Sequence, residues 1–72
     1  MARLKMLAKD NDSGRTGCPS VYLDDDGMAV VQGVLVDPDT HDSMSNVLPG
    51  EAGVRINPQV LVAAVAALQR RR

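Results

Sequence analysis

The sequence predicts a small α+β domain, in which a three-stranded, mostly antiparallel sheet carries one carboxy-terminal helix. Two observations lead to this fold class. Residues 20–23 and 28–36 are β-type runs separated by Asp-Asp-Asp-Gly, which is typical of a hairpin turn. Farther along, Asn57-Pro58 precedes a long apolar run, and this pattern is typical of a helix start, because Asn caps the first amides and Pro fits the first turn.

The strands are delimited by residues that cannot extend a ladder. Pro19 cannot donate a ladder hydrogen bond, so it suits the start of the first strand. Gly33 lies inside the second strand and predicts a bulge or the close approach of another backbone. Asp37-Pro38 ends that strand, and the apolar residues 52–56 are the third expected strand.

The first part of the chain has the composition of a flexible arm. Residues 11–17 are turn and linker types, so residues 1–17 are expected to form a flexible basic arm and residues 18–70 the single small domain. Residues 3–8 fit a short strand or one helical turn equally well. Residues 41–47 likewise fit a polar loop or a single helical turn.

The expected helix, from residue 58 to about residue 70, suggests self-association. Its main stripe against the sheet is expected to be Leu61, Ala64, Val65 and Leu68, at i, i+3, i+4 and i+7. The other faces are also apolar, and such a helix is normally buried on more than one side. A 72-residue chain buries only about 60% of its surface, and its single cysteine excludes an internal disulfide. We therefore expect a homodimer with Val60, Val62 and Ala66 in its interface.

The net charge of -1 hides a strong segregation of charge. Residues 18–54 contain seven acidic residues and neither Lys nor Arg, and both flanking segments are basic. Such a middle segment can attract a basic partner, or pair with the basic ends across a dimer. The expected partner-binding residues are Asp24, Asp25, Asp26, Asp37, Asp39 and Asp42.

The basic ends offer an alternative function, a small dimeric nucleic-acid-binding protein that uses both ends of the chain. The residues placed to contact phosphate are Arg70, Arg71 and Arg72, with Arg3, Lys5 and Lys9 at the other end. Two features argue against direct binding. The pI is about 5.6, and Tyr22 is the only aromatic residue on which a base could stack.

Residues that could carry chemistry are few, and we expect neither an enzyme, a cofactor nor a metal site. Cys18 and His41 are each the only residue of their type, and nothing in the sequence places them together. The acids from Asp37 onward lack the glycine and glutamate of a calcium-binding EF-hand loop.

Targeting features are also few. The amino-terminal residues never reach the apolar length of a secretion signal. The longest apolar run, residues 60–68, is shorter than the roughly 20 residues that cross a bilayer. The sequence therefore predicts a cytoplasmic protein without a membrane partner.

Four short motifs carry a resemblance to a known group of proteins. They are Cys18-Pro-Ser-Val-Tyr22, Val30-Val-Gln-Gly33, Leu48-Pro-Gly-Glu51 and Val54-Arg-Ile56. In this order they resemble small actinobacterial proteins of uncertain function that are encoded beside helix-turn-helix transcription regulators, over about residues 17–68. The resemblance implies a hairpin-containing sheet with a terminal helix, and a non-enzymatic protein that modulates a DNA-binding regulator. Together with the acidic middle segment, it leads us to expect a regulatory protein–protein interaction module.

Overall fold

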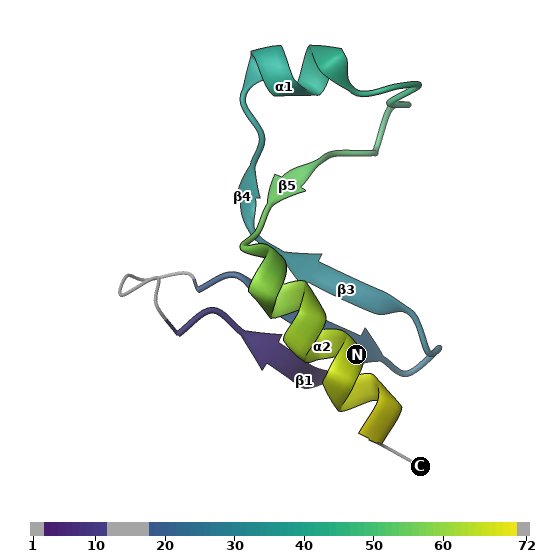
Figure 1. Ribbon diagram of the computed structural model, residues 1–72. Helices are drawn as coiled ribbons and strands as arrows, with labels where there is room; N and C mark the ends of the chain where they lie inside the picture. Colours follow the sequence, from purple (N-terminus) through teal and green to yellow (C-terminus); the bar gives the residue numbers. More distant parts are fainter. Residues whose placement is uncertain (1–2, 12–17, 71–72) are drawn as a thin grey trace.

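The computed structural model describes residues 3–11 and 18–70. The elements in chain order are β1 (Leu4–Lys9), β2 (Ser20–Asp24), β3 (Ala29–Gln32), β4 (Val34–Leu35), α1 (Pro38–Ser43), β5 (Val54–Arg55) and α2 (Pro58–Arg70). Helix α2 lies across a three-stranded antiparallel sheet, while β4, α1 and β5 extend away from it as a second small unit (Figure 1). The expected α+β class, with its antiparallel sheet and carboxy-terminal helix, is confirmed.

The third strand of the main sheet differs from the expected one. The strand order is β1-β2-β3, so Leu4–Lys9 completes the sheet. Residues 54–55, which were expected there, pair with β4 in a separate two-stranded sheet. The expectation of a flexible arm is therefore wrong for residues 4–9, while residues 12–17 lie outside the described residues. Burial explains the difference, because Leu7 and Ala8 both pack against the core.

The hairpin forms as expected, and the predicted second strand is divided at one residue. Tyr22 pairs with Val30 in the β2–β3 ladder. At Gly33 the strand breaks into β3 and β4, and an added Cβ atom there would lie 2.7 Å from the carbonyl oxygen of Arg55. The predicted close approach of another backbone is therefore confirmed.

The core lies between α2 and the first two strands. Its buried residues are Val21, Val60 and Ala64, with Leu7, Ala8 and Ile56 packed around them. The predicted helix start is confirmed, since Asn57 Oδ1 accepts a hydrogen bond of 2.9 Å from the Gln59 amide.

Of the expected stripe only Ala64 faces the sheet, because the helix is turned toward Val60 instead. Val60 and Ala64 face it, whereas Leu61 and Val65 stay 43% and 53% exposed and Leu68 is exposed to the same extent as Leu61. A helix that is apolar all round contains several overlapping i, i+4 stripes, so periodicity alone cannot choose among them. The small side chain of Ala64 lets the helix approach the sheet closely.

Candidate interaction surfaces

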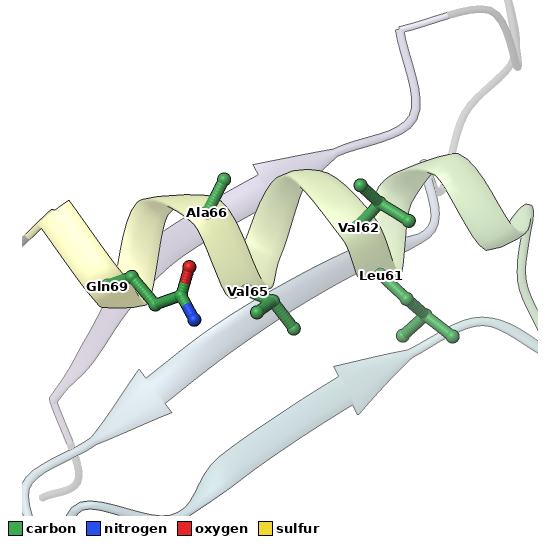
Figure 2. Close-up of a pocket in the computed structure, with 5 residues that line it drawn as sticks. All are labelled: Leu61, Val62, Val65, Ala66 and Gln69. Carbon is green, nitrogen blue, oxygen red and sulfur yellow. The ribbon is translucent and has the colours of Figure 1, made fainter.

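The outer face of α2 carries an apolar groove. The groove holds about 390 Å³ and is lined by Leu61, Val62, Val65, Ala66 and Gln69. Figure 2 shows these five side chains along one side of the helix, with Leu61 and Val65 projecting to one flank and Val62 and Ala66 to the other. Four of the five lining residues are apolar, so this surface has the character of a contact site for another apolar surface.

The three expected interface residues have different environments. Val60 is 6% exposed and belongs to the core of its own chain, so its assignment to a subunit interface is wrong. Val62 is 61% exposed, and Ala66 lies half-buried in the wall of the groove. Val60 and Val62 are separated by two residues and therefore by about 200° around the helix, so one of them faces the sheet when the other faces outward.

The sheet continues the exposed apolar surface beyond the helix. Helix α2 contacts β1 and β2. Val31 pairs with Val21, and Ala29 with Leu23, so both β3 residues lie on the face that carries the helix. All of β3 is exposed. We call Ala29 and Val31 of β3, together with Leu61, Val65 and Leu68 of α2, the apolar flank.

The sequence patterns identified only some residues of the apolar flank. The residues on α2 were recognised as apolar but were expected to face the sheet. The exposure of β3 follows from where the helix lies, over β1 and β2. The position of β1 was the missing information, because a sheet of β2, β3 and residues 52–56 would have centred the helix elsewhere.

The six expected partner-binding acids do not form one face. Asp24 ends β2, and Asp25 and Asp26 lie in the turn that follows it. Asp37, Asp39 and Asp42 belong to α1 and its cap, at a separate end of the molecule (Figure 1). The chain from β3 through β4 runs between these two groups.

The first acidic group is partly structural and lies beside positive charges. Asp24 Oδ1 accepts hydrogen bonds of 2.9 Å from the amides of both Asp26 and Met28, which holds the hairpin turn. Arg3 and Lys5 line the same surface hollow as Asp24 and Asp25. The negative electrostatic potential at this turn is therefore weaker than its three carboxylates alone would produce.

The second acidic group is also partly structural. Asp37 caps α1, and its Oδ1 accepts a hydrogen bond of 2.8 Å from the Thr40 amide. Hydrogen bonds from Thr40 are the main cause that lowers the pKa of Asp37, and the charge of Arg55 acts in the same direction. Asp42 lies 3.6 Å from Nδ1 of His41 in an exposed pair, which contributes little to stability. Asp39 is exposed in the first turn.

The predicted phosphate contacts are only partly described. Arg70 ends α2, while Arg71 and Arg72 lie outside the described residues. The start of α2 shares a hollow with Lys9 at the end of β1, so the two elements run in opposite directions and Arg70 lies toward the Arg3 end of β1. That end also holds the acidic β2–β3 turn. Positive and negative groups are therefore mixed there, which is a poor arrangement for binding a phosphate backbone.

Residues with catalytic or metal-binding potential remain dispersed. Within residues 3–11 and 18–70, no three His, Cys, Asp or Glu side chains are grouped as metal ligands would be. Cys18 precedes β2, and its carbonyl oxygen accepts a hydrogen bond of 3.0 Å from the buried Ser20 hydroxyl. His41 belongs to α1 in the second unit. Neither described helix is long and apolar enough to span a bilayer.

Comparison of the chain with family models, with characterised proteins and with solved structures gives no significant match. Its candidate function therefore has to be argued from its own surfaces.

Proposed function

We propose that this chain is a non-enzymatic protein–protein interaction module of the cytoplasm, which works as a homodimer and modulates a DNA-binding regulator. The observation that carries the proposal is the apolar flank. Only three apolar residues are buried among those described, while large aliphatic side chains of α2 and β3 stay exposed. A surface of this kind on a small protein is typical of a binding site for another protein.

The apolar flank would supply most of the affinity. Fully burying a Val or Leu side chain stabilises by about 1.5–3 kcal/mol, so covering the half-exposed Leu61, Val65 and Leu68 would contribute about 1 kcal/mol each. With Val31 these contacts would contribute about 4 kcal/mol in all, which corresponds to a dissociation constant of about 1 mM, so the contacts of this flank alone form only a weak, short-lived complex. The class of partner comes from the resemblance of the sequence motifs, which points to a helix-turn-helix regulator.

The acidic residues would act on the rate of association. Asp25, Asp26, Asp39 and Asp42 are exposed. A DNA-binding regulator presents a basic surface, and opposite charges on two partners accelerate their encounter more than they stabilise the complex. The two acidic groups lie at different ends of the molecule, so they would steer the regulator toward the surface between them.

A matched pair of variants on α2 tests the proposal. The purified protein is titrated against purified helix-turn-helix regulators, and each regulator's affinity for its DNA is measured with and without the protein. Val65→Asp places a charge in the apolar flank and is expected to weaken binding at least tenfold. Ala63→Asp places the same charge on an exposed position outside the groove and should leave binding unchanged.

Two results would contradict the proposal. One is equal binding of the regulator by both variants, because the apolar flank would then not be the contact. The other is tight binding of duplex DNA by the chain alone that Arg70→Ala weakens. That result would support the nucleic-acid-binding alternative instead.

A further inference from the structure

The two edges of the main sheet are protected to different degrees. The strand order β1-β2-β3 leaves β1 and β3 each with a single neighbour. Strand β1 carries Lys5 and Lys9 and a register shift between Met6 and Ala8, and lysines and bulges are devices that prevent an edge from pairing with another chain. Strand β3, with the sequence Ala-Val-Val-Gln, has neither charge nor proline, and its pairing with β2 is regular. The β3 edge is therefore the one suited to pairing.

The backbone of β3 presents a defined set of groups at this edge. The Met28 carbonyl oxygen accepts a hydrogen bond of 2.9 Å from the Asp24 amide, so residues 28, 30 and 32 direct their backbone groups toward β2. By alternation, Ala29 and Val31 direct their N–H and C=O groups away from β2. Among the residues that the structure describes, these two supply the unpaired backbone donors and acceptors of the edge.

We propose that β3 pairs antiparallel with β3 of a second copy of the chain, which joins two three-stranded sheets into one of six strands. The direction of the backbone groups sets the register. Ala29 of each copy must lie opposite Val31 of the other, because only residues that both point outward can exchange hydrogen bonds. Val30 then lies opposite Val30 of the second copy, on the two-fold axis.

The side chains of Val30 agree with this register. The two Val30 side chains are neighbours on the face opposite α2, where each already pairs with Tyr22 of its own chain. The symmetric contact thus joins two β-branched side chains, and such cross-strand pairs stabilise a sheet.

The pairing deepens the proposed function, since it names the surface of the homodimer and leaves the apolar flank free. The two-fold axis is perpendicular to the sheet, so both α2 helices lie on one face. Each helix covers β1 and β2 of its own chain, and with strands about 4.8 Å apart the helix axes are roughly 19 Å from each other. Packed helices have axes about 8–10 Å apart. The space above the paired β3 strands is therefore wide enough to hold one helix of a partner protein.

A cysteine on the two-fold axis tests the register directly. In the full chain with Cys18→Ser, Val30→Cys places two thiols on residues whose Cα atoms are about 4.5 Å apart, a separation that a disulfide spans. The matched control is Met28→Cys, an exposed position whose two copies would lie about 14 Å apart in this register. Oxidised glutathione is expected to cross-link the Val30→Cys protein at least tenfold faster than the control.

A second pair of variants tests the edge without a cross-link. Val31→Pro removes an outward N–H that β2 does not use, whereas Val31→Thr keeps the N–H and the branched side chain. Sedimentation should show a monomer for the first variant and a dimer for the second, with the same circular dichroism spectrum. If Val31→Pro does not fold, the cross-linking rates decide.

Three results would overturn the proposal. They are a monomeric wild-type protein at 100 µM, equal cross-linking of the two cysteine variants, and a folded Val31→Pro protein that stays dimeric. None of these measurements involves the regulator. Failure of the regulator to bind a cross-linked dimer would therefore contradict the proposed function and leave the β3 pairing standing.

Discussion

The carbonyl oxygen of Arg55 lies 2.7 Å from the point where a Cβ atom on residue 33 would stand. Gly33 is therefore the residue that lets β5 approach the junction of β3 and β4, and it joins the main sheet to the second unit. Backbone atoms cannot move aside as the end of a side chain can, so this contact leaves no room for any other residue type.

Gly33→Ala is expected to destabilise the protein by about 1–3 kcal/mol, because the added methyl group overpacks against backbone. Gly53→Ala is the control. Its Cβ atom would lie 2.9 Å from the end of the Met44 side chain, which can rotate away, and 3.5 Å from Cγ2 of Val36, an ordinary van der Waals contact. Urea denaturation of both variants measures the difference, and equal losses would contradict the assigned role of Arg55.

Val60 and Val62 differ in burial although both are valines on one helix. Val60→Ala should lower the free energy of unfolding by about 2 kcal/mol, since it removes packing from a small core. Val62→Ala should change it by less than about 0.5 kcal/mol, as for an exposed site. Thermal denaturation at low protein concentration makes the comparison, and a larger loss for Val62 would mean that it lies in a subunit interface.

The position of β1 predicts a large effect of truncation. Removing residues 1–11 deletes the strand that pairs with β2 and lies under α2, so the cooperative unfolding transition should disappear at 25 °C. Leu7→Ala removes only part of this packing and should lower the free energy of unfolding by about 2 kcal/mol. Leu4 is exposed, so Leu4→Ala should lower it by less than about 0.5 kcal/mol. An unchanged thermal midpoint after truncation would restore the interpretation of these residues as an arm.

The sequence predicted those features that depend on local chemistry. The hairpin turn at Asp24 and the helix start at Asn57 follow from side chains that bond to the backbone within four residues, and such signals are visible in the sequence. The role of Leu4–Lys9 depends on pairing with a strand more than ten residues away. Its Leu-Lys-Met-Leu-Ala-Lys pattern does not alternate cleanly, because a bulge interrupts it.

The candidate site was predicted less well, for a related reason. The sequence shows that α2 is apolar all round, but which residues face outward is set by contacts with the sheet. Val60 packs in the core with Val21, and this contact turns Leu61 and Val65 outward. The six aspartates likewise belong to one acidic segment in the sequence, and the strands between them separate the two groups in space.

The cap of α1 gives a pH dependence with a defined sign. The pKa of Asp37 is lowered from 3.8, so its stabilisation of α1 is present above pH 3.8 and is lost as the pH falls through the lower, folded-state value. Hydrogen exchange of the Thr40 amide should accelerate in that acidic range beyond the effect of pH on intrinsic exchange. Asp37→Asn keeps an acceptor and should remove this step, whereas Asp37→Ala should expose the amide at every pH.

At the β2–β3 turn, the carboxylate of Asp24 has a structural role, whereas those of Asp25 and Asp26 are exposed. Asp24→Ala removes the acceptor of two backbone amides and should destabilise the hairpin by about 1 kcal/mol, whereas Asp24→Asn keeps an acceptor and should cost less. Replacing both Asp25 and Asp26 by Asn should leave stability within about 0.5 kcal/mol, because these residues are exposed and Asn tolerates turns.

The same double variant should slow association with the regulator at low ionic strength, and the difference from wild type should shrink as salt screens the charges. Stopped-flow association rates at two salt concentrations measure the effect, and the matched variant is Asp39→Asn with Asp42→Asn at the other acidic group. Slowing by both pairs is expected if the regulator lands between the two ends. If only one double variant slows association, the regulator approaches at that acidic group. If neither variant slows association, the partner does not present a basic surface to these residues.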